Sequence, residues 1–203
     1  MTTGLTRRGG GGGGGGAYAT VTVLNPTGSY QITPGNGGTN KTKNSTVHGS
    51  ASIVKKDGSN ILVAAGGASS PYTSRDGGAG ALGGQASACT HTSNAHSGGN
   101  GGDPYGLLLG WLFTYSGGGG GAANSQGDGH NALATSEVTG GNPGTGTMPA
   151  GKGGNGRQGE SANGQVGEDY GAGGSGATAY LLGDGNIGGA GAPGVVRVTY
   201  TYN

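Results

Sequence analysis

Short stretches with the alternating apolar and polar residues of β-strands are confined to the first third of the chain and to its end. In the first third they are rich in β-branched and aromatic residues and lie at residues 17–24, 29–33, 51–55 and 61–65. The last two stretches flank Asp57-Gly58, a dipeptide that favours the tight turn of a β-hairpin. Residues 36–45 are polar and are expected to form a loop.

The end of the chain joins two different patterns. In residues 185–194, glycine recurs at every third position, which is the period of a polyproline-II-type helix. In residues 195–202, Val196, Val198 and Tyr200 alternate with polar residues, which predicts a strand with one apolar face. We expect this strand to close the fold by pairing with a strand from residues 17–65.

Between these regions, short glycine tracts alternate with inserts of other residues. The tracts keep a three-residue phase locally, but the phase resets at each insert, unlike the unbroken repeat of collagen. No long window lacks glycine or shows a 3.6-residue period, so we expect essentially no α-helix. The pattern favours a stack of short polyglycine-II helices whose backbones hydrogen-bond to one another, with the inserts as loops at the two ends.

We therefore expect a single domain over residues 1–203, mainly non-helical. Residues 1–66 form its mainly β portion, residues 67–194 its glycine-rich portion and residues 195–203 its closing strand.

Composition indicates that the backbone must carry much of the stability. Glycine accounts for 56 of 203 residues, and Leu, Ile, Val and Phe are too few for a conventional core. The formal net charge is only +1, unlike the high net charge of most disordered chains. The same charge balance lacks the excess of basic residues that is typical of proteins that bind nucleic acid. No apolar run is long enough for membrane insertion.

Several tracts resemble the glycine-rich modules of bacteriophage tail fibres. They are the glycine run that leads into a strand (residues 9–23), the element YQITPGNGG (30–38), the tracts at 117–121 and 171–176, and GAPGVVRV (191–198). The alternation of glycine tracts with variable inserts is also similar to the tip adhesins of T-even-like phages. The resemblance implies a virion protein, a sandwich of polyglycine-II helices, and receptor recognition by the loops between those helices.

No motif in the chain predicts catalysis or a cofactor. The G-x-x-x-x-G-K match at residues 146–152 has Gly153 where a nucleotide-binding loop needs Ser or Thr. Cys89, His91 and His96 have metal-ligating side chains but lack the fourth ligand of a structural zinc site. Cys89, the lone cysteine, is expected to be a small buried thiol. We therefore expect a protein that is not an enzyme and holds no metal or cofactor.

Residues 103–115, DPYGLLLGWLFTY, hold the only Trp and the only Phe of the chain. A local core or an oligomer contact is favoured, because large exposed apolar patches are uncommon. The alternatives are a displayed binding loop with aromatic anchors and packing against the rest of a fibre. If the inserts bind a receptor, the candidate contact residues are Tyr72, His91, His96, Tyr105, Leu108, Trp111, Phe113, Tyr115 and Tyr180.

These observations favour a phage adhesin or tail-fibre tip protein that binds a host cell-surface protein or glycan through its inserts. A rigid scaffold would hold the inserts in place, so that binding costs little ordering entropy. The main alternative is a structural virion protein, such as a capsid decoration or fibre subunit, that contacts other virion proteins or forms a homo-oligomer. An ice-binding protein is a third possibility, which the irregular inserts disfavour.

Overall fold

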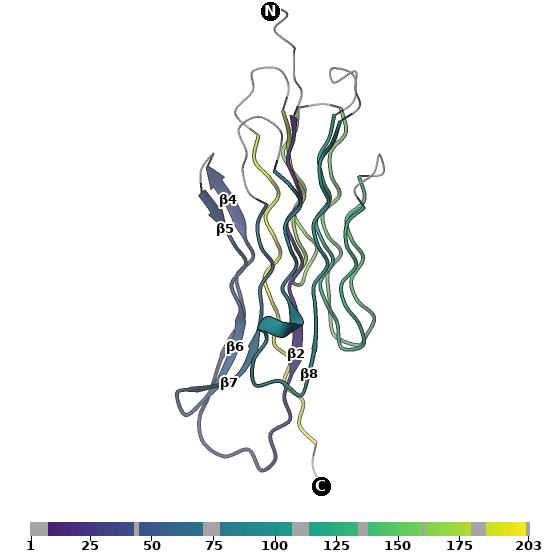
Figure 1. The fold of residues 1–203 in the computed structure, drawn as a ribbon. Coiled ribbons are helices and arrows are strands. Elements are labelled where there is room, and N and C mark those ends of the chain that lie inside the picture. The colour runs from purple at the N-terminus through teal and green to yellow at the C-terminus, as the bar shows by residue number, and fades with distance from the viewer. Residues whose placement is uncertain are drawn as a thin grey trace, which may run out of the picture.

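Extended, gently waved segments run up and down side by side along the long axis of the computed structural model (Figure 1). The structure describes residues 8–42, 45–70, 78–106, 114–133, 138–159, 161–179 and 186–201. Within these ranges the only helix is a 3-10 turn, η1 (Ala86–Ala88), and the strands form small antiparallel sheets. The prediction of a mainly non-helical fold with short strands is confirmed.

One end of the molecule, here called the β end, carries the hairpin predicted around Asp57-Gly58. Strand β6 (Ser52–Lys56) pairs with β7 (Ser59–Ala64), and β3 (Tyr30–Thr33) adds to the edge of β6. The φ angles of Asp57 and Gly58 are 47° and 84°, the left-handed values that a type I′ turn requires. Beside this sheet, β2 (Tyr18–Thr20) pairs with β8 (Asn94–His96) (Figure 1).

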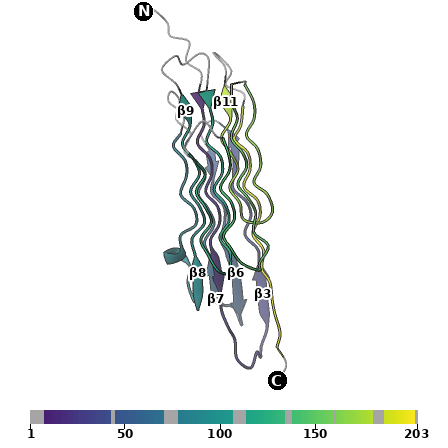
Figure 2. The same ribbon diagram turned by 90° about the vertical axis from the view of Figure 1, so that its right-hand side faces the viewer.

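The opposite end, here called the insert end, carries two further strand pairs. Strand β1 (Arg8–Gly9) pairs with β11 (Thr178–Ala179), and β9 (Tyr105–Gly106) pairs with β10 (Thr114–Tyr115). Figure 2 shows β9 and β11 at this end and β3, β6, β7 and β8 at the other. The glycine segments therefore span the distance between two sets of short strands.

Backbone hydrogen bonds hold the glycine segments together. Residues 9–17 have the composition of a flexible linker, yet they lie among the other segments and donate to three of them in rotation. Every third N–H group faces the same neighbour: Gly10, Gly13 and Gly16 donate to residues 171–177, Gly12 and Gly15 to residues 99–102, and Gly14 and Ala17 to residues 65–68. The direction of hydrogen bonding therefore repeats every three residues.

Residues 116–123 lie at the centre of this arrangement. Their N–H and C=O groups bond to six other segments: residues 9–17, 98–102, 128–133, 140–144, 151–157 and 171–176. Every residue from 114 to 124 is buried. The apolar side chains buried in the described core are mostly small: Ala81, Cys89, Ala122, Ala123, Ala132 and Ala172, with Tyr115 as the one large member. The core therefore consists largely of packed backbones.

Two strand predictions at the β end differ from the structure. The closing strand expected at residues 195–202 does not form, because residues 195–201 pair with none of the described segments. An alternating sequence favours an extended backbone but does not by itself supply a partner strand. The strand expected at residues 17–24 is limited to β2, because its partner β8 begins at Asn94, opposite Thr20.

A third difference concerns residues 36–45, which were expected to be a polar loop. They contain β4 (Thr39–Thr42), which pairs with β5 (Ser45–Val47). Ladder hydrogen bonds use the backbone, and Thr and Val have high strand propensity even in a polar segment. Polarity alone was therefore a poor guide here.

Candidate functional site

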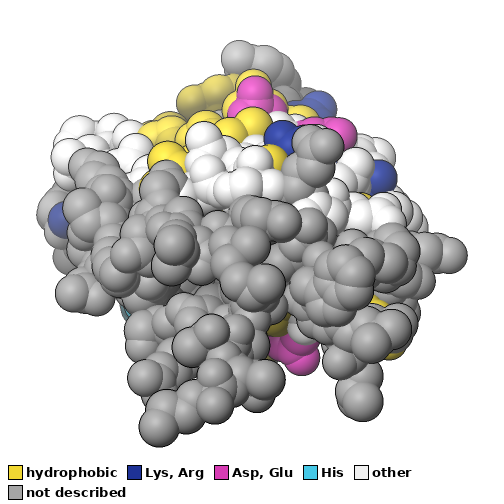
Figure 3. All heavy atoms as spheres, turned by 90° about the horizontal axis from the view of Figure 1, so that it is seen from above, with side chains coloured by type: hydrophobic (Ala, Val, Ile, Leu, Met, Phe, Trp, Pro, Cys, Tyr) yellow, Lys and Arg dark blue, Asp and Glu magenta, His cyan; other side chains and the backbone are white. Residues whose placement is uncertain are grey.

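The described borders of four inserts lie together at the insert end. These inserts contain residues 71–77, 107–113, 134–137 and 180–185, which are outside the described part of the chain. Their described borders are Ser70 and Gly78, Gly106 and Thr114, Leu133 and Val138, and Ala179 and Asn186. Figure 3 looks down on this end, and the described side chains that show there include charged ones at several places around the rim.

Hydrogen bonds hold the borders of three of these inserts. Ser70 Oγ donates to the carbonyl of Ala79 (2.6 Å), and Asn186 Nδ2 donates to the carbonyl of Thr178 (2.6 Å). The N–H of Gly156 donates to the carbonyl of Val138 (2.6 Å). The first two of these bonds each join the opposite borders of one insert, and the third ties Val138 to the neighbouring segment that contains Gly156.

Two predicted contact residues, Tyr105 and Tyr115, meet at the insert end but have different surroundings. They are cross-strand partners in the β9–β10 pair, with ring centroids 6.1 Å apart. Tyr115 is 9% exposed, and its hydroxyl accepts a hydrogen bond from Gln158 Nε2 (3.0 Å). Tyr105 is 41% exposed. Tyr115 is thus buried in the body, in line with the local core favoured for residues 103–115, whereas the ring of Tyr105 is exposed. The contact role of both residues stays a prediction.

His91 and His96 lie at the β end, because the insert formed by residues 86–97 turns there and contains η1 and β8. The His96 ring lies 6.2 Å from the Tyr18 ring, and its Nδ1 is 3.6 Å from Asp128 Oδ1. His91 has a φ of 56°. The structure therefore separates the two histidines from Tyr105. The other predicted contact residues, Tyr72, Leu108, Trp111, Phe113 and Tyr180, lie outside the described residues.

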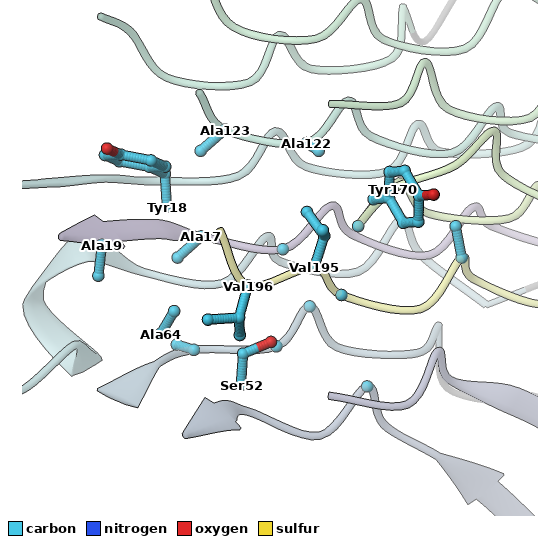
Figure 4. Close-up of a pocket in the computed structure, with 18 of the residues that line it drawn as sticks. Ala17, Tyr18, Ala19, Ser52, Ala64, Ala122, Ala123, Tyr170, Val195 and Val196 are labelled. Carbon is cyan, nitrogen blue, oxygen red and sulfur yellow. The ribbon is translucent and has the colours of Figure 1, made fainter. Parts of the chain in front are cut away.

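An apolar cavity of about 370 Å³ runs from the β end along the glycine segments as far as Ser70, and no site was predicted there. Strands β2, β3, β6 and β7 line it together with residues 195–200. In Figure 4, Val196 lies between Ala17, which precedes β2, and Ala64 of β7. The sequence signal for this cavity was the set of apolar positions in residues 17–24 and 195–202, which were assigned to a strand pair instead.

The model of the Glycine-rich domain family matches residues 2–201. The chain belongs to this family. No curated protein and no solved structure matches the chain. The likeness of this glycine-rich domain to phage fibre modules therefore stays a prediction from its sequence.

The glycine-rich domain uses short polar side chains to complete its backbone hydrogen bonds, a role that sequence analysis missed. Asn100 Oδ1 accepts a hydrogen bond from the N–H of Gly83 (2.9 Å), and Asn131 Oδ1 accepts one from the N–H of Asn100 (2.7 Å). These amide oxygens accept the kind of hydrogen bond that, in the interior, a backbone carbonyl of a neighbouring segment accepts. Their signal in the sequence is a three-residue spacing beside glycine tracts, as in Asn100 and Asp103 or Asp128 and Asn131.

Three further features concern the other chemical groups of the described residues. In the described part of the chain, no three His, Cys, Asp or Glu side chains come together to hold a metal ion. Cys89 is buried, as predicted, and its Sγ accepts a hydrogen bond from the N–H of Ala65 (3.5 Å). No described helix is long and apolar enough to cross a membrane.

Proposed function

We propose that this glycine-rich domain is a receptor-binding adhesin of a phage virion that contacts a host cell-surface protein or glycan at its insert end. The observation that carries the proposal is the gathering of the borders of four inserts at one end of the molecule. Binding residues are commonly found on loops that a rigid scaffold positions.

We also infer that the scaffold is a lattice of polyglycine-II helices. A polyproline-II-type helix has three residues per turn and no internal hydrogen bonds, so its peptide groups point outward in three directions. The three-residue rotation of donors in residues 9–17, and the six bonded neighbours of residues 116–123, are the pattern that such a lattice requires. Glycine permits the close approach of backbones that the pattern needs.

The composition of the inserts supports a role in recognition. Tyr105 presents an aromatic ring at the border of the insert that contains the only Trp and the only Phe. Aromatic side chains combine a large contact area with little conformational entropy to lose on binding. Because hydrogen bonds fix the insert borders, less backbone freedom would be lost when a receptor binds.

Binding of the purified, fluorescently labelled chain to a panel of bacterial strains and to an array of bacterial glycans tests this function. Tyr105→Ala is expected to weaken binding about tenfold, the effect of a moderate interface anchor. Tyr30→Ala is the matched control, because Tyr30 has a similar exposure, 38% against 41%, at the opposite end. Equal weakening by both substitutions, or no binding to any strain or glycan, would contradict the proposal.

A further inference from the structure

Six extended segments form a closed ring around the apolar cavity. In order around the ring they are residues 10–17, 65–68, 49–50, 35–38, 189–194 and 171–177. Each segment shares at least one backbone hydrogen bond with the next, and the ring closes where Gly13 donates to the carbonyl of Gly174 (2.8 Å). All six segments line the cavity. The cavity therefore runs along the axis of a ring of bonded backbones.

The centre of this ring has the place of one missing segment. Residues 116–123 bond to six other segments, whereas residues 10–17 bond to five, which are residues 65–68, 81–84, 98–102, 116–123 and 171–177. The sixth side of residues 10–17 faces the cavity. A Cβ added at Gly13 would point there, because its nearest atoms are the carbonyl oxygens of Gly174 (3.5 Å) and Ala68 (3.6 Å), which belong to the two adjacent segments of the ring. The ring thus has room for one more segment.

The wall of the cavity offers unpaired backbone groups to such a segment. The carbonyls of residues 10–17 point in three directions in rotation, and those of two directions accept hydrogen bonds from residues 81–84 and 116–123. Among the described residues, none donates to the carbonyl of Gly14, which points in the third direction, and none accepts from the N–H of Gly174. Both residues are buried and line the cavity. Because buried peptide groups need partners, the wall favours an occupant that has peptide groups of its own.

The cavity is long and narrow. Gly11 and Thr20 both line it, and nine residue steps at about 3.1 Å each span about 28 Å. A sphere with the same volume of 370 Å³ would be only about 9 Å across. The shape therefore fits an extended chain of about nine residues and disfavours a compact ligand.

The lining changes along the cavity. Toward Ser70 the wall consists mainly of glycine, alanine and serine, and at the β end it carries larger apolar side chains, including Leu62 and Val196 (Figure 4). Arg197 is the only charged residue among the described ones that line the cavity, and its Nη1 donates to the carbonyl of Thr147 (3.4 Å). A fitting chain is therefore uncharged, with small residues along most of its length and apolar residues at the β end.

We propose that the ring binds an extended segment of a different protein, about nine residues long, in which glycine and alanine are followed by apolar residues. The segment would complete the stack as an added strand completes a sheet, with its peptide groups bonded to Gly14 and Gly174. A different protein is the source, because the described glycine tracts of this chain are already bonded into the stack and donating one would open it. The inference goes beyond the proposed function, since it does not depend on what the inserts bind.

Titration of the full-length chain with a fluorescently labelled peptide, GGAGGAGVV, tests the inference by fluorescence anisotropy. We expect saturable binding to the unmodified chain. Gly13→Leu places a side chain in the centre of the ring and should weaken binding by about tenfold or more, because a packed site does not accept the added volume. Ala88→Leu is the matched control, since Ala88 is an exposed residue of η1 outside the cavity, and it should bind as the unmodified chain does. No saturable binding, or equal binding by Gly13→Leu and Ala88→Leu, would overturn the inference.

Nuclear magnetic resonance of the unmodified chain tests the same site without a variant. The peptide should shift the amide resonances of Gly14 and Gly174 and leave that of Gly141 unchanged, because Gly141 lies outside the ring. Shifts confined to residues outside the ring would contradict the proposed site. Self-association of the unmodified chain that Gly13→Leu abolishes would assign the ring to a second copy and would overturn the proposed partner.

Discussion

Neighbouring glycines of this protein differ in whether a side chain could replace their hydrogen. A Cβ added at Gly12 would lie 1.9 Å from the carbonyl oxygen of Gly118, whereas the nearest atom to a Cβ at Gly13 would be 3.5 Å away. Within residues 9–16, the positions with ordinary contact distances are Gly10, Gly13 and Gly16, and all others are closed. In residues 117–121, at the centre, every position is closed. A position thus requires glycine where the backbone of another segment packs closely against it.

Gly12→Ala and Gly13→Ala form a pair that tests this difference. We expect Gly12→Ala to lower the free energy of unfolding by about 3 kcal/mol, because the new methyl group meets a backbone that cannot move aside. Gly13→Ala should leave it unchanged or raise it by up to about 1 kcal/mol, because alanine restricts the unfolded chain. Urea denaturation of both variants measures the difference. Equal stabilities would show that the two glycines have the same surroundings.

At the scale of elements, the sequence predicted a strand pair correctly where the two strands lie close together in the chain. The Asp57-Gly58 hairpin was predicted because both strands and their turn lie within a few residues. Residues 195–202 had an equally clear alternation, but their expected partner was distant in sequence, and the pairing was wrong. The β4–β5 hairpin was missed because its residues are polar.

Gly58 tests the turn on which the hairpin depends. A Cβ at Gly58 would meet no atom within 4 Å, so any effect of substitution comes from its φ of 84°. We expect Gly58→Ala to lower the free energy of unfolding by about 1–2 kcal/mol, the cost of a left-handed alanine. Gly58→Asn should cost less, because asparagine tolerates this conformation. Thermal unfolding of both variants measures the effect. Equal unfolding midpoints for Gly58→Ala and Gly58→Asn would contradict the left-handed conformation of Gly58.

At the scale of the whole molecule, the arrangement separates two kinds of surface. The insert end carries the borders of four inserts and the exposed Tyr105, and the β end carries an apolar cavity and an unpaired segment. The glycine segments between them keep the two ends apart. The proposed receptor binding would therefore involve the insert end alone.

The sequence predicted stacked glycine segments, but it did not predict at which end of the molecule each insert lies. The local three-residue phase of glycine indicated segments that bond to one another. Nothing in that phase placed His91 and His96 at the end opposite to Tyr105, because the direction of each segment depends on how the whole chain folds back. The hydrogen-bond partner of Tyr115 could not be predicted for a similar reason, since Gln158 lies 43 residues away.

Hydrogen exchange of the central glycine amides tests the backbone lattice most directly. Gly117, Gly119, Gly120 and Gly121 donate to three different segments: residues 9–17 accept from Gly117 and Gly120, residues 151–157 from Gly119, and residues 128–133 from Gly121. We predict that all four amides exchange as slowly as global unfolding permits, when followed by nuclear magnetic resonance. Exchange at the rates of a flexible glycine linker would contradict the account.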